Sequence, residues 1–327
     1  MQYCDDAYAA MLLTMALSAN REEYARPLST QEFRRLTAAV RASSARSPGH
    51  LLGLDISGLM PLLGISEEEA YRIFTLLNRS VQLTYSLEGF LQQGIEVITQ
   101  YDERYPRRLT VRLGEAAPPV FYAAGNTALL SEPMLAVSGI SGVKTTAVVR
   151  GSVEKIVAEA KRLGYAVATG GELGVAHLAL TLSAAGGGTL VDVLGGGLAE
   201  HIRDERFAGM LREGRAVAIS LEHPEALFTV SHAIARNKLL FALAEAAFIF
   251  NSDGKRGELD AVRSRTCDFI YAWNGHSGNA PLIAKGATPF DDAARLDFEE
   301  LRRRWLGSRA EQLNLFDMLA EGDAQAK

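Results

Sequence analysis

The chain has little of several residue types on which common protein functions depend. Its 327 residues include only two cysteines, Cys4 and Cys267, too few for a disulfide framework or a zinc–cysteine cluster. No apolar run approaches the roughly 20 residues that a membrane-spanning helix needs. We therefore expect a cytoplasmic protein that binds no metal and does not enter a membrane.

The chain also lacks a large excess of charge of one sign. Its formal net charge is −5. Residues 101–290 carry 20 basic and 19 acidic side chains, so this segment is close to neutral. Binding of nucleic acid must then depend on a local basic patch, because no positive field surrounds the whole molecule.

Signatures of a defined reaction are missing as well. The segment 138–146, SGISGVKTT, is not a P-loop, because Val143 precedes Lys144 where that motif needs glycine. The Gly-x-Gly-x-x-Gly pattern of nicotinamide-binding proteins is absent from it too. We also find no carboxylate pair, no Ser/His/Asp order and no metal-ligand spacing. We predict a protein that is not an enzyme and needs no cofactor.

What the sequence does contain is a repeated pattern of strand, glycine turn and helix between Met134 and Leu198. The β runs MLAVS, YAVAT and TLVDVL each end in glycine where a helix is expected to begin. Such glycine turns, next to helix N-termini, are where α/β sheets bind phosphate groups. The pattern predicts a phosphorylated ligand, which is either a nucleotide or a nucleic-acid backbone.

Residues 1–100 are predicted to form a helical N-terminal domain. Their apolar residues recur every three or four positions, and Ser66 before three glutamates is a typical helix start. The alternating run IEVIT predicts a short strand at the end of this part. YPRRL and APPVFYAAGN, which follow, are predicted to form an extended connector.

Residues 101–290 are predicted to form an α/β domain with a Rossmann-like, doubly wound sheet. Its later strands are predicted at residues 216–220, 246–250 and 268–273. Residues 291–327 are expected to be a charged helix, over 291–309, and a flexible tail. The chain is thus divided at about residues 100 and 290.

Candidate binding residues follow the ends of the predicted strands. Glycine lets backbone approach a ligand closely, and lysine, arginine and asparagine donate hydrogen bonds to phosphate or base. The residues assigned to a DNA or phosphate site are Gly139, Gly142, Lys144, Thr145, Gly170, Gly171, Gly195, Gly196, Gly197, Arg236, Asn237, Lys238, Lys255, Arg256 and Gly257. The plainer interpretation is a set of tight turns and solvated helix faces, since sequence does not show that these residues converge.

An ordered series of motifs over about residues 100–290 resembles the DNA-processing protein A family, also called DprA or Smf. YPRRL, LAVSG, GTLVDVLGGGL, ARNKLLFALAEAAFIF and GNAPLIAKGA all have counterparts there. The resemblance implies an extended Rossmann-like fold that binds single-stranded DNA, often as a homodimer, and hands it to a RecA-type recombinase without catalysis. The helical N-terminus is similar to the family's sterile-alpha or helix-hairpin domain. We expect a divergent member without a C-terminal winged helix.

The departures from the family leave a second hypothesis open. Segment 137–140, VSGI, has no arginine, segment 169–177, TGGELGVAH, has no aspartate, and Lys238 replaces an arginine. Glu258 puts a carboxylate where a DNA backbone would pass. These changes also suit a sensor of a small nucleotide. A phosphoribohydrolase is less well supported, because its Pro-Gly-Gly motif is missing.

The tail carries a further motif, Gln312-Leu313-Asn314-Leu315-Phe316, which resembles the pentapeptide that binds bacterial sliding clamps. The alternative is the last turn of an amphipathic helix packed on the body of the protein. If the motif is real, replacing Leu315 and Phe316 with alanine removes both apolar anchors and lowers clamp affinity about tenfold or more. Calorimetric titration with purified clamp tests this, and unchanged affinity excludes the motif.

Overall fold

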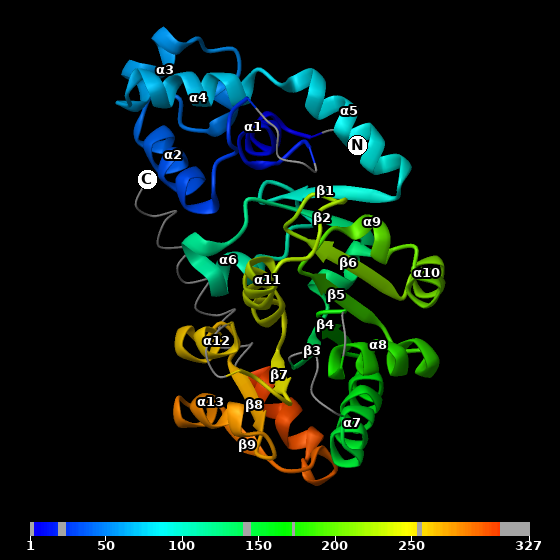
Figure 1. The fold of residues 1–327 in the computed structure, drawn as a ribbon. Helices are drawn as coiled ribbons and strands as arrows, with labels where there is room; N and C mark the ends of the chain where they lie inside the picture. The colour runs from blue at the N-terminus through cyan, green and yellow to red at the C-terminus, as the bar shows by residue number, and fades with distance from the viewer. Residues whose placement is uncertain (1–2, 19–23, 140–144, 172–173, 254–256, 308–327) are drawn as a thin grey trace.

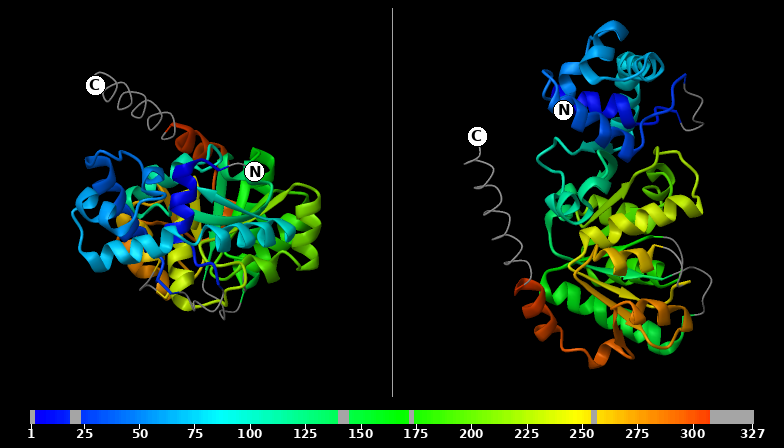
Figure 2. Two further views of the ribbon diagram at one scale, coloured as in Figure 1. Left: turned by 90° about the horizontal axis from the view of Figure 1, so that it is seen from above. Right: turned by 90° about the vertical axis from the view of Figure 1, so that its left-hand side faces the viewer.

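The computed structural model describes residues 3–18, 24–139, 145–171, 174–253 and 257–307. A group of helices lies at one end, and a long twisted sheet with helices on both faces extends away from it (Figure 1). The right-hand view of Figure 2 shows the same arrangement from the side, with the helix of residues 298–307 at the end far from the N-terminal helices.

The N-terminal helices pack around α1, which is buried on nearly all sides. Their bounds are α1 Asp5–Thr14, α2 Thr30–Ala42, η1 Pro48–Leu51, α3 Ile56–Leu63, α4 Glu67–Leu77 and α5 Ser80–Gln92. The helix start predicted at Ser66 is confirmed, since its hydroxyl accepts from the Glu69 amide at 3.3 Å in a capping box. The buried Arg79 side chain donates to the carbonyls of Leu12 and Met15, and so fixes the end of α1.

The described residues form one sheet of nine strands, in the order β1-β2-β6-β5-β4-β3-β7-β8-β9. The strands are β1 Ile95–Thr99, β2 Val120–Gly125, β3 Met134–Ser138, β4 Ala166–Thr169, β5 Leu190–Leu194, β6 Ala216–Ser220, β7 Ala246–Ile249, β8 Phe269–Trp273 and β9 Thr288–Phe290. All neighbours from β6 to β9 are parallel, whereas β2 runs antiparallel to β1 and β6. The doubly wound α/β sheet predicted from sequence is confirmed.

The prediction of an extended connector after residue 100 is wrong. Arg107–Leu113 form helix α6, and Val120–Gly125 form β2, which lies between β1 and β6. The apolar run in β2 is buried along nearly its whole length, because both neighbours and both faces of the sheet cover it. Strand β1 also joins this sheet, although it lies within residues 1–100.

Helices cover both faces of the sheet (Figure 1). One face carries α6, α11 Val230–Leu243, α12 Glu258–Ser264 and α13 Ala280–Ala284. The other carries α7 Ala147–Leu163, α8 Val175–Gly186, α9 Leu198–His201 and α10 Glu205–Arg212. Short 3₁₀ turns connect these elements at η2 Gly114–Ala116, η3 Thr127–Ser131, η4 Ser277–Asn279 and η5 Ala293–Arg295.

The chain becomes helical again at residue 298 and remains so to residue 307, where the described residues end. The charged helix predicted from residue 291 therefore begins later. Trp305 is 1% exposed and packs on Tyr165, with ring centroids 6.0 Å apart. No helix in the described ranges is long and apolar enough to span a membrane.

The two edges of the sheet differ. Beside β1, the N-terminal helices pack on the sheet, and Tyr3 donates from its hydroxyl to the Val97 carbonyl at 2.9 Å. At the other edge lies β9, a three-residue strand whose middle residue is the exposed Pro289. Proline cannot donate a backbone hydrogen bond, so it suits an edge position.

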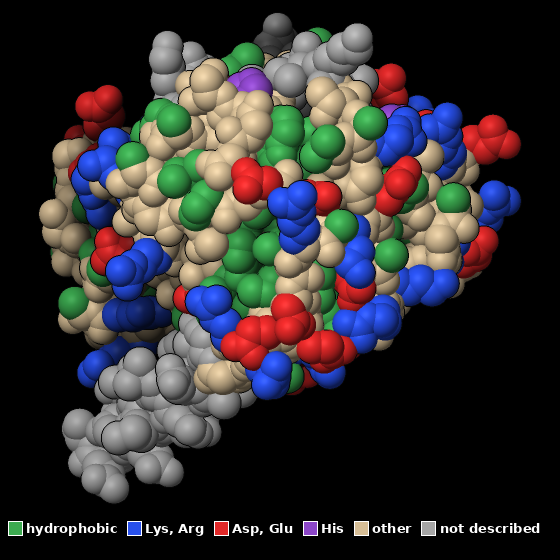
Figure 3. Space-filling model, turned by 90° about the horizontal axis from the view of Figure 1, so that it is seen from below, with side chains coloured by type: hydrophobic (Ala, Val, Ile, Leu, Met, Phe, Trp, Pro, Cys, Tyr) green, Lys and Arg blue, Asp and Glu red, His purple; other side chains and the backbone are tan. Residues whose placement is uncertain are grey.

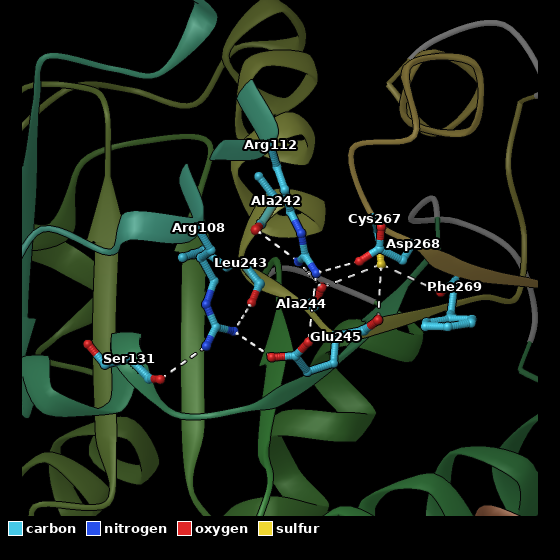
Figure 4. A network of polar contacts seen from close by, with 10 residues as sticks. All are labelled: Arg108, Arg112, Ser131, Ala242, Leu243, Ala244, Glu245, Cys267, Asp268 and Phe269. Atoms are coloured by element: carbon cyan, nitrogen blue, oxygen red, sulfur yellow. Dashed lines mark hydrogen bonds and ion pairs between the residues drawn. The ribbon is translucent and has the colours of Figure 1, made fainter. Parts of the chain in front are cut away.

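Two arginines of α6 hold the carboxyl end of α11 (Figure 4). Arg108 donates to the carbonyl of Leu243 at 2.6 Å. Arg112 donates to the carbonyls of Ala242 and Ala244. Carbonyls in the last turn of a helix have no partner within the helix, so cations there satisfy them and favour the helix dipole.

Carboxylates complete this arginine cluster. Arg112, only 7% exposed, lies 2.9 Å from Asp268 and 3.7 Å from Glu245. Arg108 lies 3.3 Å from the same Glu245 carboxylate. The cluster ties α6, α11, the start of β7 and the start of β8 together, so it fixes where α11 crosses the sheet.

Replacing Arg112 with alanine should lower the free energy of unfolding by about 3 kcal/mol, because buried carbonyls and Glu245 lose their partner. Urea denaturation measures the loss. The matched control is Arg150→Ala, which removes an exposed i,i+4 pair with Glu154 and should cost about 0.5 kcal/mol or less. Equal losses in the two variants would contradict the role assigned to the cluster.

Candidate nucleic-acid interface

The described glycine turns that follow β3, β4 and β5 lie at one edge of the sheet, because these strands are parallel. Gly139 follows β3, Gly170 and Gly171 follow β4, and residues 195–197 follow β5. The chain moves from β3 to β4 on one side, and β7 pairs with β3 on the other. Ligands of open α/β sheets bind outside the carboxyl ends of the strands at such a switch point.

Two of these glycines are required by neighbouring side chains. A Cβ on Gly170 would lie 1.3 Å from Nη1 of Arg236, so the guanidinium rests directly on the Gly170 backbone. Arg236 also donates to the Val193 carbonyl at 3.3 Å. A Cβ on Gly139 would lie 2.3 Å from Oδ1 of Asn251. Among the described residues, the switch point is therefore lined by backbone and by the side chains of Arg236 and Asn251.

Asn237 closes the side of this crevice next to α12. A Cβ on Gly257, whose φ is +46°, would lie 2.8 Å from Nδ2 of Asn237. The same amide donates to Glu258 at 3.3 Å, and the Ser252 hydroxyl donates to the other Glu258 oxygen at 3.4 Å. Burial raises the pKa of Glu258, and the charge of Asp253 acts in the same direction against the opposing effect of Arg236.

A buried carboxylate lies beneath Gly171. Asp192 is 0% exposed in β5 and accepts from the Thr169 hydroxyl at 2.8 Å. A Cβ on Gly171 would lie 2.4 Å from its Oδ2. His201 Nε2 lies 2.8 Å from that oxygen as an ion pair. Burial lowers the pKa of His201, but the hydrogen bond and charge of Asp192 outweigh it, so the pKa is raised above 6.5.

The three glycines at 195–197 accommodate the protein's own chain. A Cβ on Gly197 would lie 2.1 Å from the carbonyl oxygen of Pro224, and one on Gly195 would lie 3.1 Å from the Phe228 ring. The Gly197 amide donates to the Ala226 carbonyl at 2.8 Å. The sequence analysis expected a ligand to lie close to these glycines. In the structure, the loop after β6 lies against them instead.

Lys238 does not lie with Arg236 and Asn237. It is exposed and borders a hollow with Gln31 and Glu115, on the side of α11 that faces the N-terminal helices. Residues two apart on a helix point about 200° apart, which separates Lys238 from Arg236. The sequence analysis assigned both residues to one DNA or phosphate site, and the structure places them on different sides of α11.

Other predicted residues have a limited description. Thr145 lies just before Thr146, whose side chain caps α7. Residues of the predicted site that fall outside the described ranges are Gly142, Lys144, Lys255 and Arg256. The clamp-like residues Gln312, Leu313, Leu315 and Phe316 fall outside them as well.

Sequence reasoning missed Asp192 and Asn251. Asp192 is the one charged residue in the apolar run LVDVL, a signal that could have indicated a buried polar cluster. Asn251 directly follows the AAFIF run, at a strand end where ligand-facing residues are common. Their partners, His201 and Gly139, come from distant positions that no local pattern connects.

The face at the β9 edge looks different from the crevice (Figure 3). Acidic and basic side chains alternate there around a hydrophobic area, with no field of one sign. Such a surface offers little attraction to a phosphodiester backbone. The carboxyl edge of the sheet is therefore the better candidate site.

A mostly parallel sheet covered on both faces, with glycine turns at its switch point, defines a Rossmann-like fold. The sequence profile of the DNA recombination-mediator protein A family matches residues 96–296. The chain belongs to that family, whose members mediate DNA recombination. No curated protein sequence gives a significant match.

Solved structures agree in fold. DNA processing protein A from Streptococcus pneumoniae is similar with a TM-score of 0.62 and 17% identity, over 91% of this chain and 99% of that one. DNA processing protein A from Helicobacter pylori, described as having a unique single-stranded DNA binding mode, is similar with a TM-score of 0.51 and 19% identity. That match covers 64% of this chain and 96% of the other.

The His201–Asp192 pair predicts a pH dependence of stability. A pKa raised by folding stabilises the protein fully below the unfolded value of about 6.5, and the effect is lost as pH rises through the folded value. Replacing His201 with glutamine should therefore lower the free energy of unfolding most at acidic pH and progressively less above about pH 6.5. Urea unfolding across a pH series tests this, and a loss that does not change with pH would contradict it.

Proposed function

We propose that this chain is a non-catalytic mediator that holds single-stranded DNA along the carboxyl edge of its sheet. Its pathway would be recombination, transformation or the handling of foreign DNA. The observation that carries the proposal is Arg236, whose guanidinium lies against Gly170 at the switch point. A planar fork of donors beside bare backbone suits a phosphodiester group.

The surrounding elements support an anionic ligand. Helices α7 and α8 begin at the same edge, after β3 and β4, and their N-termini carry partial positive charge. Asn237 and Asn251 add neutral amide groups that suit sugar or base atoms. These groups would bind and orient a ligand. A binding role explains their presence, and no catalytic role is needed for them.

Family membership supports three further parts of the proposal. The protein acts as a homodimer, delivers the strand to a RecA-type recombinase, and works in the cytoplasm. The relative from H. pylori is described by its binding of single-stranded DNA. Residues 312–316 would add a contact with the sliding clamp.

A small nucleotide is the second candidate ligand, and two buried carboxyl groups favour it. Asp192 is 0% exposed and Glu258 is 4% exposed, and both lie close to the glycines of the crevice. Their oxygens already contact Thr169, His201, Asn237 and Ser252, so these groups act on a ligand through their charge, which disfavours a chain of many phosphates more than one small nucleotide. Thermal stabilisation by a nucleotide, with little dependence on salt, would support this alternative.

Fluorescence anisotropy with a labelled single-stranded oligonucleotide across a salt series tests DNA binding. The affinity should fall steeply with salt, and Arg236→Ala should weaken binding about tenfold and reduce the log–log salt slope by about 0.7. Gly170→Ala should weaken binding similarly with the charge retained, because its Cβ occupies the place of the guanidinium.

The control for the loss of a positive charge is Arg212→Ala. Arg212 is an exposed arginine in the last turn of α10. This variant should bind DNA like the unchanged protein. If no binding is seen at low salt, or if Arg212→Ala and Arg236→Ala weaken binding equally, the crevice is not the DNA site.

A further inference from the structure

A pocket of about 640 Å³ lies at the carboxyl ends of β5 and β6, beside the glycine turn. We call it the β5–β6 pocket. It is bounded by Gly171, by residues 194–197, by side chains between Ala199 and Asp204, and by the loop 224–228. Its volume is within the range of about 300–1,000 Å³ that is usual for specific ligand sites. It is large enough for one or two apolar side chains.

Large apolar side chains are exposed on the wall of this pocket and next to it. Leu227 is 84% exposed, Phe228 is 51% exposed and Val230 is 58% exposed. A single exposed apolar residue needs no explanation, but a contiguous group beside a pocket marks an interaction site. Aromatic residues are also the most frequent energetic anchors of protein interfaces.

The wall is held in place by the turn beneath it. The Gly197 amide donates to the Ala226 carbonyl at 2.8 Å, and the Ala199 amide donates to the Pro224 carbonyl at 2.9 Å. Beyond the loop, Thr229 caps α11 by accepting from the His232 amide. A loop fixed at both ends loses little conformational entropy on binding, so the site is largely preformed.

The rim of the pocket is acidic. Glu200, Asp204 and Glu225 line it against a single arginine, Arg203, while His201 is paired with Asp192. A phosphate placed about 4 Å from one of these carboxylates would be repelled by about 1 kcal/mol even in water. A phosphodiester chain is thus disfavoured here, and cationic side chains are favoured.

We propose that the β5–β6 pocket binds a protein partner through an extended segment with an apolar anchor flanked by lysine or arginine. The anchor packs against Leu227 and Phe228, and the flanking cations face Glu200 and Glu225. This pocket adjoins the crevice at the switch point, because Gly171 lines it as well, but its apolar wall comes from the loop after β6. The mediator would then hold nucleic acid and a partner protein at different positions along one edge of its sheet.

The test uses the full chain and a fluorescein-labelled peptide with a central Leu-Phe pair between two lysines on each side. Anisotropy should show saturable binding, and Phe228→Ser should weaken it about tenfold or more, as expected for a central apolar anchor. The double variant Glu200→Lys with Glu225→Lys should weaken it similarly. Both glutamates are exposed, so this variant keeps the fold even if Phe228→Ser does not.

Two controls separate this site from general adhesion. A peptide with glutamates in place of lysines should not bind the unchanged protein, and should gain affinity for the double lysine variant. Val148→Ser removes a 50% exposed apolar side chain on α7 and should leave peptide binding unchanged.

Three results would overturn the proposal. One is the absence of saturable binding by the lysine peptide, and another is equal binding by both peptides. The third is displacement of the peptide by single-stranded oligonucleotide, together with equal weakening of DNA binding by Phe228→Ser, which would make nucleic acid the occupant. Loss of DNA binding in Arg236→Ala with peptide binding kept would separate the two sites.

Discussion

The contact between α6 and the end of α11 fixes the helix that brings Arg236 and Asn237 to the carboxyl edge of the sheet. Helix α11 leaves the loop after β6, crosses one face and delivers the chain to β7 on the far side of β3. Arg108 and Arg112 fix its carboxyl end through carbonyls and shared carboxylates. Because Arg236 and Asn237 lie in the middle of this same helix, their position over the glycines depends on the cluster at its carboxyl end.

Glycine has two distinct uses at this edge. Gly170 and Gly139 leave room for the side chains of Arg236 and Asn251, so the polar surface of the crevice comes from other elements. Gly197 instead leaves room for the backbone at Pro224, which builds the wall of the β5–β6 pocket. Glycines thus shape both a crevice that holds Arg236 at the switch point and a neighbouring pocket with an apolar wall and an acidic rim.

The strands were largely predictable, because buried parallel strands are short apolar runs that end in glycine. Strand β2 was missed because Pro118 and Pro119 precede it, and its antiparallel place between β1 and β6 is set by tertiary pairing. The separation of Lys238 from Arg236 follows from helix geometry alone. By contrast, the pairing of Asp192 with His201 and the contact of Gly197 with Pro224 join positions whose distance in space no local pattern reveals.

The two closed edges of the sheet limit how copies of this chain can assemble. Helices α1 and α5 pack beside β1, and Pro289 removes a donor from the short strand β9 at the other end. At the β9 edge, a three-residue strand with a proline in its middle offers no long row of donors and acceptors to another strand. A second copy gains little by continuing the sheet there, so contacts at this end of the molecule must come from side chains on helices and loops.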